Sequence, residues 1–297
     1  MIINGANLSM LYKGFKTSFQ KGLDEAPSQW SVVATRVTST TREEEYGWLG
    51  KFPQLREWIG DRVIQNMKAH SYSIKNKTFE GTVSVDRDDI EDDNIGLYAP
   101  LFEEMGRSTK AFDDQLVWGL LKQGWTGKCY DGQAFFDAEH PVLNEAGKEV
   151  SVANTDGGNG TPWFLIDDTR ALKPLILQER KKFQFVAKDE AKDENVFMRK
   201  EYVYGVDGRR NVGFGFWQFA WGSRQELTPE SYALARKSLM EMKGDYGRPL
   251  GLRPTKLIVP PGLEGKSLKI LNNDLAAGGE TNEWKGTAQA VVVPWLA

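Results

Sequence analysis

The longest regular pattern of apolar residues lies between residues 97 and 121, where they return at every third or fourth position. This spacing places them on one side of an α-helix. A helix of about 25 residues is roughly 37 Å long, and Gly106 in its middle predicts a close contact or a slight bend. The predicted apolar stripe consists of Leu97, Leu101, Met105, Thr109, Phe112, Leu116 and Leu120.

The N-terminal residues carry a second, shorter helical stripe, after which threonines at 38–41 favour an extended chain. The residues of this stripe are Leu8, Leu11, Phe15 and Phe19. We predict that residues 1–45 form an arm rather than the opening of a compact domain. Residues 46–67 are rich in aromatic residues, and their second half predicts a core helix that packs through Trp58.

Alternation with a period of two replaces helical spacing between residues 72 and 85. One phase of the alternation contains Tyr72 and Ile74, and the other contains Phe79, Gly81, Val83 and Val85. A change of phase requires a turn or a bulge, which must lie near Lys75, Asn76 and Lys77. The pattern therefore predicts a hairpin over about residues 68–92, with polar residues at its tip.

An acidic turn follows directly, with acidic side chains at Asp86, Asp88, Asp89, Glu91, Asp92 and Asp93. Read as a calcium loop that starts at Glu91, the segment places Gly96 correctly, but Ile95 fills a ligand position. A solvated turn that favours the positive N-terminal end of the following helix explains the same residues. The second interpretation is the stronger one.

The C-terminal half begins with loops over residues 125–162 and continues with strand-like runs over residues 163–221, including NVFMRKEYVYGVDGRR. The last ninety residues alternate helix and strand. Thr228 followed by Pro229 is a typical helix start, LRPTKLIVPP predicts a buried strand, PGLEGKSLKIL a short helix and AVVVPWL a closing strand. Together with the long helix, these elements indicate an α+β protein.

The amino-acid composition excludes several classes of protein and kinds of site. The 297 residues include 38 basic and 41 acidic side chains, which excludes the overall basic charge of a typical nucleic-acid binder. The single cysteine excludes a disulfide framework and cysteine-cluster metal sites. No signal peptide or membrane-spanning run is expected, so we predict a cytosolic protein without membrane partners. Ten tryptophans suit either a core or a buried subunit interface.

The candidate catalytic motifs are weak. GLEGKS at 262–267 has too few residues between its glycines for a phosphate-binding loop, and GFGFWQ at 213–218 lacks the last small residue of a dinucleotide fingerprint. Cys129 and His140 could supply a nucleophile and a base, but such a pair also needs an orienting third group and an oxyanion hole, and no family signature surrounds this cysteine. Two histidines are too few for a multi-histidine metal site. The sequence therefore predicts no enzyme, no cofactor and no metal.

Six longer runs, which span the chain from about residue 8 to its end, resemble the major head subunit (T protein) family of Mu-like phages and prophages. They are YGWLGKFPQLREWIGDR, YSIKNKTFEGTVSVDRDDIEDD, CYDGQAFFDAEHPV, WFLIDDTRALKPLILQERKKF, VFMRKEYVYGVDGRRNVGFGFWQFAWGS and GRPLGLRPTKLIVPP. The resemblance implies the tailed-phage major capsid fold, shared with encapsulins and the herpesvirus capsid floor. It also implies a structural virion protein.

The family's architecture implies the following parts: an N-terminal arm at 1–45, a peripheral domain that begins at 46–67, an extended hairpin loop at 68–92, the rest of the peripheral domain at 93–225 with a spine helix at 97–121, and an axial domain with a closing strand at 226–297. The family's axial helices normally precede its last peripheral strands, whereas here the strands at 163–221 precede the helices at 229–271. The connectivity after residue 125 therefore departs from the family pattern.

The implied partners are other copies of the chain, as pentamers and hexamers of an icosahedral head assembled in the bacterial cytoplasm. A separate scaffolding protein, a portal, a decoration protein and packaged double-stranded DNA on the inner face, bound without sequence specificity, complete the set. Two alternatives remain: an encapsulin-like compartment shell, and a hydrolase that uses Cys129 and His140.

Overall fold

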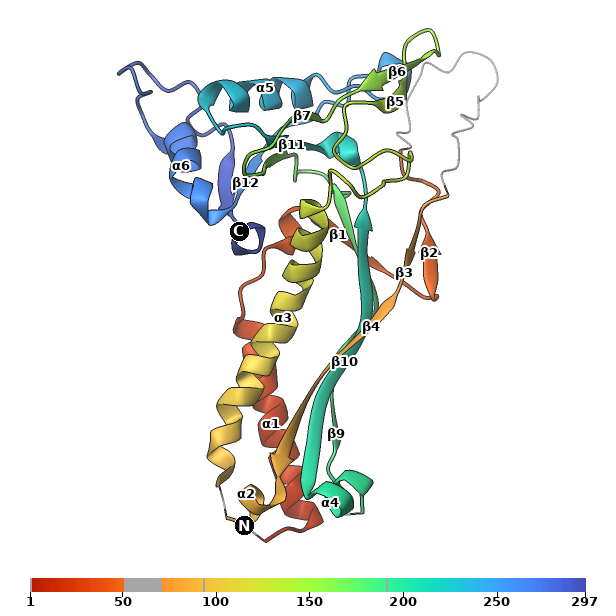
Figure 1. Ribbon diagram of the computed structural model, residues 1–297, viewed down its shortest axis with the longest axis vertical. Helices are drawn as coiled ribbons and strands as arrows, with labels where there is room; N and C mark the ends of the chain where they lie inside the picture. Colours follow the sequence, from red (N-terminus) through yellow and green to blue (C-terminus); the bar gives the residue numbers. More distant parts are fainter. Residues whose placement is uncertain (1, 51–70, 93, 191) are drawn as a thin grey trace.

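The computed structural model describes residues 2–50, 71–92, 94–190 and 192–297. In Figure 1, a long lower part contains two helices that lie along a four-stranded sheet, and an upper part is built on a second sheet. The N-terminus lies at the lower end. The C-terminus returns to the upper end of the long helix, where Lys122 Nζ donates to the carbonyl oxygen of Ala297 at 2.9 Å.

The predicted long helix is present as α3 (Tyr98–Lys122), but its buried side differs from the predicted stripe. Leu97 and Leu101 are 75% and 45% exposed, and the residues at 105, 112, 116 and 120 are half-buried. The buried side lies about one position further along and consists of Phe102, Gly106, Thr109, Asp113, Asp114, Val117, Trp118 and Leu121. The stripe was misplaced because small and charged residues occupy half of these buried positions.

The predicted N-terminal helix is α1 (Gly5–Glu25), and it packs along α3 of the same chain. Gly106 marks the point of closest approach, since a Cβ built there would lie 2.1 Å from the carbonyl oxygen of Phe19. A Cβ on Gly22 would lie 1.9 Å from the carbonyl oxygen of Glu103. The close contact predicted at Gly106 is therefore confirmed, and two glycines allow the two helix backbones to touch.

The lower sheet contains four strands in the order β1 (Ala34–Thr38), β9 (Leu175–Lys188), β10 (Glu201–Phe214) and β4 (Lys77–Asp86). Strand β1 runs parallel to the first residues of β9, and the other pairs are antiparallel. Side chains of α1, α3 and one face of this sheet form an apolar core around Phe15, Phe102 and Tyr204.

The predicted hairpin over residues 72–85 is wrong. Asn76 only interrupts the strand, and the two halves pair with other strands: β3 (Ser73–Lys75) with β2 (Glu43–Glu45), and β4 with β10. Alternation reports which residues face inward but not which strand lies alongside. The predicted helix over residues 55–67 lies outside the described residues.

The upper sheet contains five strands in the order β13 (Gln289–Val292), β12 (Lys256–Val259), β8 (Trp163–Ile166), β11 (Ala220–Arg224) and β7 (Thr155–Gly158). Helices α5 (Pro229–Met240) and α6 (Glu264–Asn272) pack with it. Strands from 155–166 and 220–224 thus share one sheet with strands from 256–292. A separate hairpin pairs β5 (His140–Leu143) with β6 (Glu149–Val152).

Local sequence signals explain two of these elements. Thr228 caps α5 in a capping box with Ser231, as the Thr-Pro start predicted. The run NVFMR was predicted as strand but forms α4 (Glu194–Arg199), which joins β9 to β10. Its apolar residues suggested a strand, yet two of them face solvent.

In the described residues, no helix is long and apolar enough to span a membrane.

Candidate assembly surfaces

A group of basic side chains, here called the basic band, crosses the lower sheet at one level. It consists of Lys77, Arg180, Lys181, Lys182 and Arg209. The pairing register places Arg209 of β10 opposite Lys181 of β9. Lys77 of β4 lies at the same level but opposite Arg210, so it points to the side of the sheet that α3 covers. Two register shifts in β9 at this level turn Arg180 and Lys182 toward solvent.

Acidic groups neutralise part of this band. Lys181 forms an ion pair with Asp207 at 2.5 Å. Glu80 of β4 lies opposite Asp207, and its carboxylate accepts a hydrogen bond from Thr82 at 2.7 Å. Within the described part of the chain, Arg180 and Lys182 form no ion pair. The band is therefore a positively charged, solvent-exposed part of the sheet.

The predicted acidic turn forms the short helix α2 (Arg87–Glu91) at the lower end of the molecule. Asp86 caps this helix by accepting a hydrogen bond from the N–H of Asp88 at 2.8 Å. Asp89 accepts a hydrogen bond from the hydroxyl of Tyr98 at 2.5 Å, and Asp92 is exposed. We call residues 86–92 the acidic tip; Asp93 lies outside the described residues.

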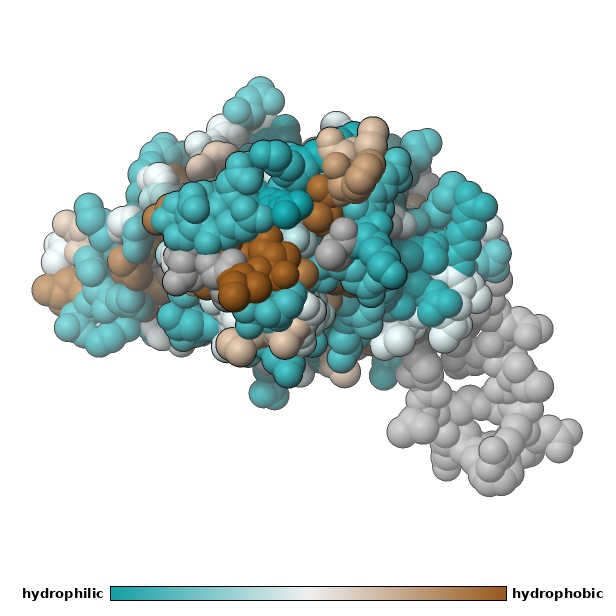
Figure 2. All heavy atoms as spheres, turned by 90° about the horizontal axis from the view of Figure 1, so that it is seen from below, coloured by the Kyte–Doolittle hydropathy of each residue, from teal (hydrophilic) through white to brown (hydrophobic). Residues whose placement is uncertain are grey.

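Two large apolar side chains beside the acidic tip are exposed. Phe197 is 84% and Met198 is 69% exposed on α4, whose end contacts α2 through the Lys200–Asp88 ion pair at 3.4 Å. Figure 2 views the molecule from below and shows that hydrophobic atoms are exposed among hydrophilic ones on this side of the molecule. Exposed apolar residues of this size are typical of surfaces that bind another protein.

The residues predicted to form an assembly hairpin lie in different environments. Lys75 and Lys77 are exposed, Ile74 and Val85 are buried, and Tyr72, Phe79 and Val83 are half-buried. Asn76 is buried: its side-chain amide donates to Ser39 at 2.8 Å and accepts from Gln178 at 2.9 Å. It ties the junction of β3 and β4 to Ser39 and to Gln178 of β9, so it is a structural residue and not a free loop tip.

The residues assigned to the arm are buried within the chain itself. Leu11, Phe15 and Phe19 are 7%, 4% and 2% exposed and belong to the lower core. The ring of Phe15 stacks on Phe102 of α3 with 4.4 Å between the centroids. In the isolated subunit, residues 5–25 thus stabilise the long helix. A role of residues 1–45 as an arm toward a neighbouring subunit stays a prediction.

A buried cluster of charged side chains, which the sequence analysis missed, joins α3 to the lower sheet. Arg210 is 3% exposed and binds Asp113 of α3 and Glu179 of β9, the latter at 3.5 Å. Its guanidinium also lies 3.9 Å from the ring centroid of Phe183. Burial raises the pKa of Asp113, against the opposing effect of Arg210. This cluster holds the helix against the sheet at the level of the basic band.

The structure brings Cys129 and His140 together through a third residue, Asp131. The Cys129 thiol donates to one carboxylate oxygen of Asp131 at 2.9 Å, and His140 Nδ1 lies 2.7 Å from the other. Although burial acts to raise it, hydrogen bonds from His140 and Cys129 lower the pKa of Asp131. Burial raises the pKa of the Cys129 thiol, which is the opposite of what a nucleophile requires.

The three groups offer ligand atoms within 4.8 Å of one another, the spacing that a metal ion would need. Both short distances are already explained by hydrogen bonds to the carboxylate. The ring of His140 stacks on Trp217 at 3.8 Å, and its Nε2 is buried without a hydrogen-bond partner among the described residues. The arrangement fixes the loop that precedes β5 and holds the thiol and His140 Nδ1 on the two oxygens of one carboxylate.

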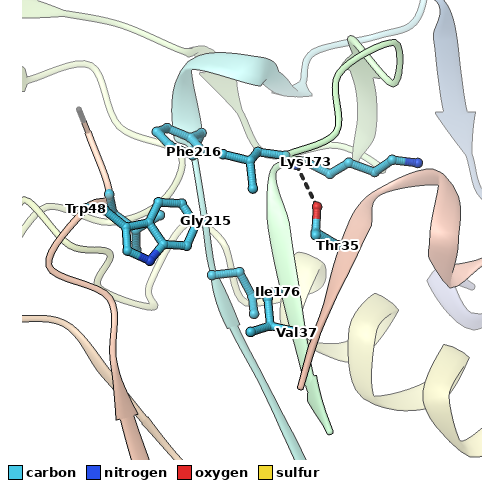
Figure 3. Close-up of a pocket in the computed structure, with 9 residues that line it drawn as sticks. Thr35, Val37, Trp48, Lys173, Ile176, Gly215 and Phe216 are labelled. Atoms are coloured by element: carbon cyan, nitrogen blue, oxygen red, sulfur yellow. Dashed lines mark hydrogen bonds between the residues drawn. The ribbon is translucent and has the colours of Figure 1, made fainter. Parts of the chain in front are cut away.

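Figure 3 shows a small apolar pocket where β1, β9 and the end of β10 meet near Trp48. Its free volume is about 10 Å³, enough for one water molecule at most. The single hydrogen bond drawn there joins the N–H of Lys173 to Thr35 Oγ1 at 2.9 Å. This pocket is a packing feature and is too small for a substrate.

Comparison with known proteins shows the family of this chain. The family described as Mu-like prophage major head subunit gpT matches residues 8–296. The major capsid protein of Escherichia phage Mu is 48% identical over the full length of both chains. The Mu-like prophage FluMu major head subunit of Haemophilus influenzae is 45% identical over 90% of this chain and 89% of its own.

The fold has the same relatives. A subunit in the procapsid of bacteriophage JBD30 superimposes with a TM-score of 0.88, at 46% identity, over 99% of this chain and 100% of that chain. The predicted family and the tailed-phage capsid fold are therefore confirmed. The chain belongs to the Mu-like prophage major head subunit gpT family and is a structural protein of the phage capsid.

Proposed function

We propose that this chain forms the icosahedral head of a Mu-like phage by assembling as pentamers and hexamers around packaged double-stranded DNA. The observation that carries the proposal is the full-length match to the major capsid protein of phage Mu at 48% identity. The structure is consistent with it, because the elongated lower part of the subunit exposes charged and apolar side chains that none of the described elements covers. Contacts between different surfaces of identical subunits produce closed rings when the rotation between them allows it.

The partners of the head belong to the same proposal. We propose that a scaffolding protein directs closure, that a portal occupies one vertex and that a decoration protein binds the outside. Non-specific DNA contact on the inner face needs no base-reading groups. An overall net charge of -3 suits it only if the contacts are local and few.

The proposal also includes the absence of catalysis. The raised pKa of Cys129 and the position of Asp131 between the thiol and His140 both oppose nucleophilic chemistry. A Cys129→Ala variant should assemble like the wild-type protein, because no function depends on the thiol. A measurable turnover that disappears in this variant would contradict this part of the proposal.

The test is expression of the protein alone and together with the scaffolding protein of its phage, followed by sedimentation and electron microscopy. Closed shells, or rings of pentamer and hexamer size, are the expected result. A strictly monomeric or dimeric protein under both conditions would overturn the proposal. Shells from infected cells should contain DNA; shells that contain only a cargo protein would instead indicate a cellular compartment.

A further inference from the structure

We propose that the acidic tip of one subunit binds the basic band of a second copy, and that this contact is one of those that build the shell. The inference rests on the proposed function and names two surfaces that carry it out. The first is the open face of the lower sheet at the level of Arg180, Lys181, Lys182 and Arg209. The second is residues 86–92, together with the neighbouring end of α4.

Charge complementarity is the first argument. The acidic tip has five carboxylates; Arg87 is engaged by Glu91 at 2.8 Å, and Lys200 at the end of α4 pairs with Asp88 at 3.4 Å. The basic band has Arg180 and Lys182 exposed and without ion pairs in the described part of the chain. Each surface thus carries an excess of one sign that the other can neutralise.

A single subunit cannot bring these two surfaces together. Strand β10 passes both of them, because its residue Arg209 lies opposite Lys181, and its residue Glu201 lies opposite Asp86. These positions of β10 are eight residues apart, which corresponds to about 26 Å of strand. At physiological salt, exposed charges separated by more than about 8 Å are largely screened from each other. The two surfaces can neutralise each other only between two molecules.

The exposed apolar residues beside the acidic tip support the same contact. Phe197 and Met198 leave most of their surface in water in the isolated subunit, at 84% and 69% exposure. The aliphatic parts of the arginine and lysine side chains in the basic band can cover such rings and thioethers. Arg180 can also stack on the Phe197 ring, since guanidinium groups pair well with aromatic faces. The contact therefore has an apolar centre as well as charged edges.

The proposed contact is heterologous, since it joins two different surfaces of the same chain. A two-fold dimer would satisfy it twice, because the tip of each copy would then meet the band of the other. In a ring, the same contact runs head to tail from subunit to subunit until the ring closes. The proposed function requires the ring form, and sedimentation distinguishes it from a dimer.

The test is a pair of charge reversals and their combination. In the first variant, R180E and K182E reverse the basic band. In the second, E91K and D92K reverse the acidic tip at the end of α2, where a positive charge suits the helix dipole. The control, K13E and K237E, changes the charge by the same amount as the first variant at exposed positions on α1 and α5.

We expect each reversal to lower the yield of sedimenting shells by about tenfold, because attractive contacts become repulsive ones. The combined variant should recover most of the wild-type yield, and the control should assemble normally. Circular dichroism of the unassembled subunits checks that each variant is folded. Assembly of wild-type subunits should also weaken as salt is raised from 50 mM to 500 mM.

Normal shells from both reversed variants would overturn the inference and leave the proposed function standing. The same holds if the combination assembles no better than either reversal alone. Failure of the wild-type protein to assemble under any condition would overturn the proposed function, and this inference with it.

Discussion

The contact between α1 and α3 depends on two glycines, and one of them offers a sharp test of the fold. A Cβ at Gly106 would lie 2.1 Å from the carbonyl oxygen of Phe19 and 2.7 Å from the backbone nitrogen of Leu23. Both atoms belong to the backbone, so no side chain can rotate away. Gly106→Ala therefore forces α1 to move from the long helix.

The change in the free energy of unfolding caused by Gly106→Ala is the sum of opposing effects. Alanine favours a helix over glycine by about 1 kcal/mol. Overpacking costs about 1–3 kcal/mol, and each large apolar side chain of α1 that returns to water costs about 2 kcal/mol more. Four such side chains face the lower core, namely Leu8, Leu11, Phe15 and Phe19. We expect Gly106→Ala to lower the free energy of unfolding by about 2 kcal/mol at least.

Gly119 in the same helix provides the matched control. A Cβ there would have no atom within 4 Å, so Gly119→Ala should raise the free energy of unfolding by about 1 kcal/mol through helix propensity alone. The assay is urea unfolding of the unassembled subunit, followed by tryptophan fluorescence and circular dichroism. If Gly106→Ala is as stable as Gly119→Ala, the close packing of α1 on α3 described above is refuted.

Three further predictions concern stability. Asp113→Asn should lower the free energy of unfolding by about 3 kcal/mol, because it leaves the buried guanidinium of Arg210 without one of its charged partners. Glu104→Gln, which removes the exposed ion pair with Arg107, should lower it by less than about 0.5 kcal/mol. Equal effects of the two substitutions in a urea titration would argue against the buried cluster. Thr228→Ala should cost about 1 kcal/mol by removing the cap of α5, and an unchanged unfolding midpoint would speak against the capping box. Backbone N–H groups of Thr40 and Thr41 lower the pKa of Glu44 from 4.5 to about 2. The stability contributed by the Glu44 carboxylate is therefore present above pH 4.5 and is lost as the pH falls toward 2. Over this interval, the wild-type protein should lose more stability than the Glu44→Gln variant. Parallel profiles of stability against pH for the two proteins would contradict this prediction.

Elements with strong local signals were predictable from the sequence. The long helix was placed to within two residues at each end because its periodicity is regular over seven turns. The start of α5 followed from Thr228 and Pro229, and the close contact at Gly106 followed from the cost of glycine within a helix. The family resemblance then supplied the fold, which no local signal could give.

The errors have physical reasons of a different kind. The buried side of α3 was misplaced because Gly106, Asp113 and Asp114 lie inside, where Asp114 accepts hydrogen bonds from the backbone N–H groups of Gln29 and Trp30 at 2.8 and 2.7 Å. Apolar periodicity does not detect buried residues that are polar but paired. The strand partners were missed because β4 pairs with a strand more than a hundred residues later.

Of the candidate surfaces, the sequence shows those made from one continuous run of residues and not those made from several strands. The acidic tip was visible as a run of carboxylates, and the lysines at 75 and 77 were noticed as exposed. The basic band was not, because its residues come from three strands that only the register of the sheet aligns. Asp131 was likewise missed as the residue between Cys129 and His140, although it lies two positions from the cysteine.

The most direct test of the central claim is an electron cryomicroscopy reconstruction of particles formed by this chain. The account predicts a closed icosahedral shell in which the subunit, with α3 lying along the four-stranded sheet, repeats in rings of five and six. Particles without such rings, or a protein that never forms particles with its scaffolding protein present, would contradict the claim that this chain builds a phage head.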